Sequence, residues 1–312
     1  YYNFIFINYM NFPTFPTFSK ISLGTSQFGN GDYKMSYNYC KAIIDKALSN
    51  KINYIDTSPY YGDGKAEDMV GKCLKNVTRD RYIISSKAGR NSDKTYSYRY
   101  YDIANSVMKS IQRLGCGYID ILFINDIEYA ENIDIIIQES LPALLYLKRQ
   151  GYIKYIGLSG FYLKKMNYVI ERTSCIDYVL SYGCYTLIND TLNHFAPGWN
   201  SKNIKIIQGG VTNKGLLSNN VVNCNTSVSY QEQDICKKMN DFCHVNKVNI
   251  VEKAFYFTLA YKRISTILVG INSVDELEEY MNWLDKEYSN NNRFINTLIE
   301  MSKPIKNKEW LF

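Results

Sequence analysis

The chain of 312 residues has little of what several classes of protein need. It contains only two histidines, and its eight cysteines include no Cys-x-x-Cys pair, so we expect no zinc site. No stretch approaches the ~18 consecutive apolar residues of a membrane-spanning helix. The 36 basic residues, against 30 acidic ones, are spread along the chain and form no basic block of the kind that binds nucleic acid or acidic lipid. We therefore expect no metal, no membrane and no nucleic-acid partner.

The composition is that of a globular protein with a sizeable core. Hydrophobic residues make up 46% and charged residues 21%, which excludes disordered and disulfide-scaffold classes. The scattered cysteines are typical of a reducing compartment, so we expect the protein to be cytoplasmic. Residues 1–18 are rich in aromatic residues but are interrupted by Asn and Pro, and no basic segment precedes them, which disfavours a cleaved signal.

Short β-branched runs alternate with longer amphipathic stretches along the whole chain. The predicted strands are residues 21–23, 53–56, 82–86, 120–124, 155–159, 177–180, 204–207 and 266–269. The predicted helices include residues 36–50, 102–114, 133–150, 162–172, 227–246, 249–263 and 294–301.

This order predicts an α/β fold, a (β/α)8 TIM barrel. An open doubly wound sheet is the alternative, but it usually carries a Gly-x-Gly-x-x-Gly turn, and none occurs here. We expect an N-terminal segment of residues 1–18 and a single barrel domain of residues 19–312. Residues 227–246 predict an extra helix before the last strand, and residues 294–301 predict a helical tail.

Polar residues follow three neighbouring predicted strands, where the active site of such a barrel lies. Asp56 ends the second strand, Tyr61 follows it, and Lys87 follows the third. A partly buried Lys87 needs a counter-charge, which Asp56 can supply. A cation near Tyr61 stabilises the phenolate and lowers its pKa from ~10, towards the range where it exchanges a proton with a carbonyl oxygen. Each residue alone has an ordinary structural explanation, and only their joint placement indicates a site.

Several segments in order make the resemblance clear: Ile-Asp-Thr-Ser at 55–58, Tyr61-Gly62, Lys87, and Gly-Tyr-Ile-Asp-Ile-Leu at 117–122. From about residue 21 to about residue 284 the chain resembles the aldo-keto reductase superfamily. Residues 180–182 and 185–190 are most similar to its L-galactose dehydrogenase branch.

The resemblance implies an oxidoreductase that uses NAD or NADP as cofactor. A hydride would pass between nicotinamide and the carbonyl or alcohol carbon of an aldehyde, ketone or sugar. Tyr61 would be the proton donor, with Asp56 and Lys87 tuning it. The residues implied to bind the cofactor are Thr25, Ser26, Ser159, Gly160, Ser181, Gly210, Val211, Thr212, Gly270, Asn272, Ser273, Glu276 and Glu279.

Three positions depart from the family pattern. Asn125 stands where the family has its catalytic histidine, and its amide can donate a hydrogen bond but cannot titrate near neutral pH. Gly209 replaces an aromatic residue that often stacks on nicotinamide, and Tyr280 replaces an Asn near the adenine. Potassium-channel β subunits, which belong to the same superfamily, also carry Asn at the first position. The alternative is therefore a cofactor-binding regulatory or scaffolding subunit with a protein partner and little turnover, whereas the intact Asp56, Tyr61 and Lys87 favour the enzyme.

Overall fold

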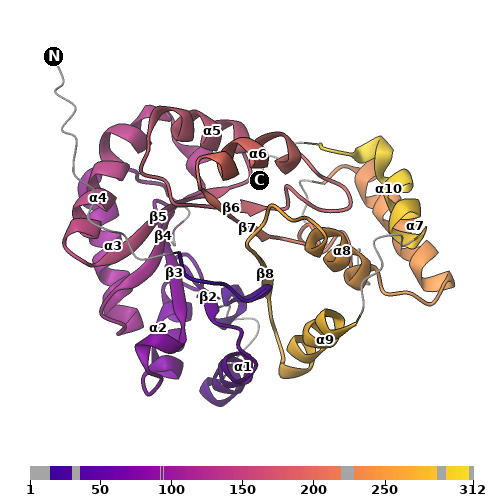
Figure 1. Ribbon diagram of the computed structural model, residues 1–312, viewed down its shortest axis with the longest axis horizontal. Helices are drawn as coiled ribbons and strands as arrows, with labels where there is room; N and C mark the ends of the chain where they lie inside the picture. Colours follow the sequence, from indigo (N-terminus) through magenta and orange to yellow (C-terminus); the bar gives the residue numbers. More distant parts are fainter. Residues whose placement is uncertain are drawn as a thin grey trace.

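The computed structural model describes residues 15–29, 36–91, 93, 95–218, 228–286 and 293–308. Eight parallel strands pair in sequence order and close into a barrel (Figure 1). The predicted (β/α)8 architecture is confirmed, and each predicted strand overlaps an observed one. The strands are β1 (Ile21–Gly24), β2 (Tyr54–Asp56), β3 (Ile83–Ala88), β4 (Ile119–Asn125), β5 (Ile153–Gly160), β6 (Tyr178–Tyr182), β7 (Lys205–Gly209) and β8 (Thr266–Gly270).

Helices surround this barrel, and the predicted extra helix and helical tail lie together. Figure 1 shows α7 and α10 side by side at the outer edge of the molecule, and the two helices contact each other. No described helix is both long and apolar enough to cross a membrane. The helices are α1 (Tyr37–Ser49), α2 (Lys65–Leu74), α3 (Tyr100–Leu114), α4 (Leu141–Arg149), α5 (Leu163–Arg172), α6 (Leu192–Ser201), α7 (Tyr230–Val245), α8 (Ile250–Leu259), α9 (Val274–Asp285) and α10 (Arg293–Ser302).

One predicted helix differs from the observed structure. Residues 133–150 were expected as a single regular helix, but a π-helical segment, Ile136–Ser140, precedes α4. Pro142 lies in the first turn of α4, where its missing N–H leaves the normal bond to the preceding turn unmade. The π segment therefore lies directly before the turn in which Pro142 interrupts the backbone hydrogen bonds.

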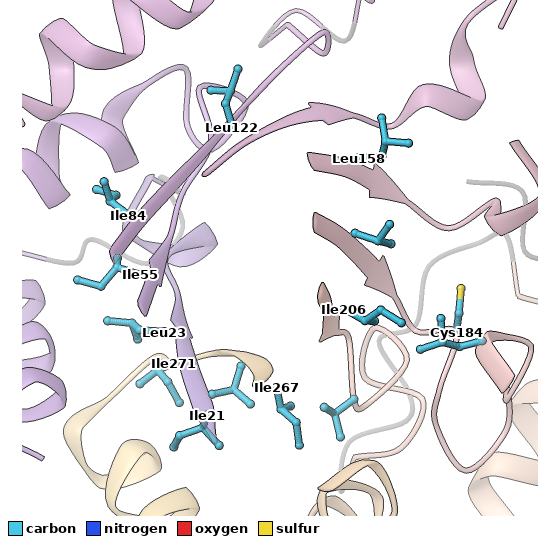
Figure 2. Packing of buried hydrophobic residues seen from close by; sticks show 14 of the residues in the cluster. Ile21, Leu23, Ile55, Ile84, Leu122, Leu158, Cys184, Ile206, Ile267 and Ile271 are labelled. Atoms are coloured by element: carbon cyan, nitrogen blue, oxygen red, sulfur yellow. The ribbon is translucent and has the colours of Figure 1, made fainter. Parts of the chain in front are cut away.

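Alternate residues of each strand point to opposite surfaces of the barrel wall. One set packs against the helices, as Figure 2 shows for Leu23, Ile55 and Leu158. The other set fills the barrel interior and is rich in large side chains: Tyr54, Ile83, Ile121, Phe123, Tyr155, Tyr178, Leu180, Ile207 and Leu268.

Two aromatic residues just before β1 cover the N-terminal end of this interior. The Phe15 ring lies 5.4 Å from that of Tyr155, and the Phe18 ring lies 4.9 Å from that of Tyr54, measured between centroids. Of the predicted N-terminal segment, residues 1–14 lie outside the described residues. Phe15 and Phe18 thus close the N-terminal end of the barrel interior.

Candidate active site

The three predicted catalytic side chains meet at the C-terminal mouth of the barrel. Asp56 ends β2 and Lys87 lies near the end of β3, and each is 1% exposed. The Lys87 ammonium donates to Asp56 Oδ2 at 2.6 Å, to the carbonyl oxygen of Thr57 at 2.9 Å and to the Tyr61 hydroxyl at 3.3 Å. An ammonium has three donors, so all of them are used. The three side chains therefore form one hydrogen-bonded unit.

Two hydroxyl groups inside the barrel, those of Ser85 and Tyr54, support this unit, and sequence reasoning did not identify them. The Ser85 hydroxyl donates to Asp56 Oδ1 at 2.6 Å. Its oxygen lies 2.8 Å from the Tyr54 hydroxyl, which must be the donor because the only proton of Ser85 is already given to Asp56. Both oxygens of the Asp56 carboxylate thus accept a hydrogen bond, Oδ1 from Ser85 and Oδ2 from Lys87.

Burial and the neighbouring charges act in opposite directions on the pKa of Tyr61. Burial raises this pKa because the phenolate loses its hydration, Lys87 lowers it, and Asp56 raises it again, with a net upward shift. Burial alone would lower the pKa of Lys87, but Asp56 and Tyr61 raise it above its usual value. The expected lowering of the Tyr61 pKa by Lys87 is present, but burial outweighs it and the pKa lies above its usual value. Lys87 only limits the rise, and Tyr61 remains a protonated phenol at neutral pH.

The loop that carries Tyr61 is fixed by a close approach of two backbone segments. Gly62 has a φ of +61°, and a Cβ atom there would lie 1.9 Å from the carbonyl oxygen of Gly29. Only glycine tolerates both this conformation and this contact. The carbonyl oxygen of Tyr61 also accepts a hydrogen bond from the backbone of Ala66 in α2, at 3.2 Å. The backbone contact between Gly62 and Gly29 and the hydrogen bond from Ala66 thus fix the backbone position of Tyr61.

A second polar group lies on the next strands around the mouth. Asn125 at the end of β4 is paired in register with Ser159 of β5, and the Ser159 hydroxyl donates to Asn125 Oδ1 at 2.8 Å. Tyr182 ends β6 and faces the interior, as Leu180 does. Burial raises the pKa of Tyr182 far above its usual value, the neighbouring Tyr61 and Asp56 raise it further, and a hydrogen bond with Ser159 lowers it. Tyr182 therefore lies among the polar groups of the mouth.

The opposite half of the mouth is built from glycine. Gly24 of β1 and Gly270 of β8 are paired in register, and Gly270 follows the interior-facing Leu268 by two residues. Gly209 of β7 is the next interior position, and a Cβ atom there would lie 3.3 Å from the Tyr182 ring. At these three strand ends the mouth therefore presents backbone instead of side chains, beside the polar half.

Two of the predicted cofactor residues do not face the mouth. Ser181 lies between Leu180 and Tyr182, which face the interior, so its side chain is on the outer surface of β6. The Thr25 hydroxyl is buried and donates to the carbonyl oxygen of Asp56 at 2.9 Å, which joins β1 to β2. A direct role of these two side chains in cofactor binding stays a prediction.

The remaining predicted cofactor residues lie in loops around the mouth. Ser273 caps α9 by accepting a bond from the Glu276 backbone at 3.0 Å, and Glu276 Oε2 accepts from the Asn272 backbone at 2.8 Å. These bonds are typical of a helix start and give the loop its shape. The others are placed as follows: Ser26 after β1, Gly160 at the end of β5, Gly210, Val211 and Thr212 in the turn after β7, Gly270 at the end of β8, and Glu279 exposed on α9.

A buried glutamate that sequence reasoning missed lies just beyond Asn125. Glu128 Oε1 accepts a hydrogen bond from the Phe161 backbone at 3.0 Å, and its Oε2 lies over Gly160, where a Cβ atom would come within 2.3 Å. The pKa of Glu128 is raised to about 7: burial is the main cause, the Phe161 bond opposes it, and the nearby Asp126 charge adds to it. No strand pattern points to this residue, because it lies in the 3-10 turn Ile127–Tyr129 and is positioned by the backbone N–H of Phe161, just after β5.

The pKa of Glu128 predicts a pH dependence of stability. The folded pKa of about 7 lies above the usual 4.5, so the associated stabilisation is complete below pH 4.5 and is lost as the pH rises through 7. Glu128→Gln removes the titration while keeping the bond to Phe161. Urea unfolding at pH 5 and pH 7.5 should therefore give a smaller difference in unfolding free energy for the variant than for the wild type. An equal difference in both proteins would show that Glu128 titrates normally.

With the fold and site described, comparison with known proteins identifies the family. The family model described as "Aldo/keto reductase family" matches residues 20–293. The chain belongs to the aldo/keto reductase family.

Relatives of this aldo/keto reductase include sugar dehydrogenases. The chain is 32% identical to L-galactose dehydrogenase of Arabidopsis thaliana over 265 residues, which covers 84% of this chain and 82% of that protein. It is 28% identical to D-arabinose 1-dehydrogenase of Saccharomyces cerevisiae, covering 80% and 78% of the two chains. The holo form of an aldo-keto reductase from Bacillus halodurans has the same fold, with a TM-score of 0.76, 22% identity and 94% of each chain covered. The predicted superfamily and its L-galactose dehydrogenase branch are thus confirmed.

Proposed function

We propose that this aldo/keto reductase transfers a hydride between NAD(P) and C1 of an aldose, with Tyr61 as the group that gives or takes the proton. The observation that carries the proposal is the buried unit in which Lys87 binds both Asp56 and the Tyr61 hydroxyl. The dehydrogenases of L-galactose and D-arabinose among the relatives support an aldose as the substrate class.

The chain's own residues have separate tasks in this reaction. A bound nicotinamide supplies the hydride donor or acceptor. In reduction, the protonated Tyr61 hydroxyl gives its proton to the carbonyl oxygen, and the Lys87 charge stabilises the phenolate that remains. In oxidation, the deprotonated form of Tyr61, which the Lys87 charge stabilises, takes the proton of the C1 hydroxyl while the C1 hydrogen leaves as hydride, which gives the lactone. Asp56 keeps Lys87 charged in both directions.

Asn125 and Ser159 are proposed to orient the reactants. Since Ser159 donates to Asn125 Oδ1, the Asn125 amide nitrogen is directed away from Ser159 and can donate to a substrate oxygen. Ser159 retains an acceptor site for a carboxamide. The Asn125 amide can therefore orient the substrate as the family's histidine would, but it supplies no titratable proton.

Binding and turnover measured together test the proposal. Purified protein would be mixed with reduced cofactor and a panel of aldehydes, ketones and sugars, and with oxidised cofactor and a panel of aldoses. We expect both tight cofactor binding and cofactor turnover, with aldoses among the substrates. Tight cofactor binding without turnover of any compound would instead favour the regulatory subunit that Asn125 suggests.

NAD should bind at least as well as NADP. Glu276 lies in the first turn of α9, and two hydrogen bonds from Asn272 fix its carboxylate. This negative charge would repel the 2′-phosphate of NADP, whereas it could accept a hydrogen bond from the ribose hydroxyl of NAD. Fluorescence titration with NADH and NADPH measures both affinities, and Glu276→Gln should strengthen NADPH binding relative to NADH. A clear preference of the wild type for NADPH would contradict this assignment of Glu276.

Asn125→His distinguishes an enzyme limited by a missing acid from a cofactor-retaining scaffold. An imidazole with a pKa near ~6.5 beside Tyr61 should speed up carbonyl reduction, most strongly below neutral pH. The measurement is single-turnover oxidation of bound reduced cofactor by an aldehyde, from about pH 5.5 to 8 around that pKa. A variant slower than the wild type at every pH would show that Asn125 itself is the group tuned for the reaction.

A further inference from the structure

A cavity of about 350 Å³ lies beside the catalytic group, above the ends of β5, β6 and β7. Its wall combines aromatic rings with polar side chains, among them Glu128, Phe161, Tyr182, Asn189, Asn213 and Lys214. The Phe161 and Tyr182 rings lie 5.5 Å apart between centroids at an angle of 49°. This size and this mixture of apolar surface and few polar groups are typical of a site for a small molecule.

Tyr182 joins this cavity to the catalytic group. Its ring lines the cavity, while its hydroxyl lies close enough to Ser159 for a hydrogen bond and close enough to Tyr61 and Asp56 for their charges to raise its pKa. A molecule whose reacting carbon lies at Tyr61 therefore extends past Tyr182 into the cavity.

Two buried polar atoms of the cavity wall have no hydrogen-bond partner among the described residues: Glu128 Oε2 and Asn213 Oδ1. Asn213 Oδ1 is an acceptor, and so is Glu128 Oε2 when the carboxyl group is ionised, so both atoms need a hydrogen-bond donor. Asn213 is 6% exposed, and the other oxygen of Glu128 is already bound to the Phe161 backbone. Buried acceptors without donors are costly, and a ligand that brings O–H groups recovers this cost.

A simple aldehyde or ketone cannot supply what these atoms need, because its only polar atom is another acceptor. A sugar carries several hydroxyl donors and C–H faces that pack on the rings of Phe161 and Tyr182. We propose that Glu128 and Asn213 are specificity residues that bind the hydroxyl groups of a polyhydroxylated substrate whose C1 lies at Tyr61. This inference rests on the proposed function and adds the chemical class of substrate that the site prefers.

Two probes that react at the same kind of carbon test the inference. D-arabinose and L-galactose are hemiacetals with several further hydroxyls, whereas 2-hydroxytetrahydropyran is a cyclic hemiacetal with none. At pH 8, where Glu128 is mostly ionised, we expect the wild type to have a kcat/KM at least ~10-fold higher for one of the sugars than for 2-hydroxytetrahydropyran, since hydrogen bonds to a charged group are strong. In Glu128→Gln this ratio should fall about tenfold, mainly through the KM for the sugar.

Control variants separate recognition from general damage. Glu131→Gln removes an exposed carboxylate from the same loop and should leave the ratio unchanged. Asn213→Gly removes the second acceptor without strain, because Asn213 has a φ of +48°, and it should lower the ratio as well. An unchanged ratio in both Glu128→Gln and Asn213→Gly, or a wild type that oxidises 2-hydroxytetrahydropyran as well as both sugars, would overturn the inference.

Failure of the proposed function would look different. In that case the wild type turns over neither the sugars nor 2-hydroxytetrahydropyran, and calorimetric titration of cofactor-free protein with the two sugars becomes the test. Sugar binding that Glu128→Gln weakens about tenfold would keep the cavity assignment, and absence of sugar binding would reject it.

Discussion

Tyr61→Phe should reduce carbonyl turnover at least ~100-fold while cofactor binding persists, because the change removes the transferable proton and keeps the ring. The phenol oxygen lies at a fixed position, 3.3 Å from Lys87 Nζ. Among the described residues, Tyr61 supplies the one hydroxyl group that is hydrogen-bonded to Lys87. Steady-state reduction of the best aldehyde of the panel and fluorescence titration with reduced cofactor give the two quantities.

Tyr60→Phe is the matched control for this variant. Tyr60 is the neighbouring residue, but its ring packs under the Arg90 guanidinium, 3.7 Å from the centroid, and the three hydrogen bonds of Lys87 go to other residues. We expect turnover of Tyr60→Phe close to that of the wild type. Unchanged turnover in Tyr61→Phe would mean that another group supplies the proton.

Lys87→Met should lower the free energy of unfolding by roughly 3–5 kcal/mol, because it leaves the buried carboxylate of Asp56 without its counter-charge. Chemical denaturation measures this loss. The double variant Asp56→Asn/Lys87→Met removes both charges and should regain a large part of it. The exposed pair of Lys238 and Asp234, at 2.7 Å, supplies the control: Lys238→Met should lower the free energy of unfolding far less than Lys87→Met, because an exposed ion pair contributes little. A loss in Lys87→Met as small as that in Lys238→Met would show that Asp56 and Lys87 do not depend on each other.

The barrel could be predicted from the sequence because its strands are marked by local pattern. Alternation of β-branched runs with amphipathic stretches places all eight strands, and the rule that parallel strands end at one edge brings Asp56, Tyr61 and Lys87 together. The π turn before α4 could not be predicted, because it depends on how the chain accommodates Pro142 within a helix.

The supporting residues of the site were harder to predict because they act through contacts between strands. Ser85 matters only because its hydroxyl meets Asp56 across the β2–β3 pair. Strand alternation does indicate that Tyr182, and not Ser181, shares the interior face with Leu180, and this signal could have been used. The sign of the pKa shift of Tyr61 could not be obtained from sequence, because it is a balance between burial and the Lys87 charge.

Transfer of deuterium from a sugar to the cofactor tests the central claim most directly. The wild type would be incubated with oxidised NAD and D-arabinose or L-galactose that carries deuterium at C1, and the reduced cofactor would be analysed by mass spectrometry. The account predicts one deuterium in each reduced cofactor, with formation of the sugar lactone, and loss of this product in Tyr61→Phe. Bound cofactor that acquires no deuterium while the labelled sugars remain unchanged would contradict the account.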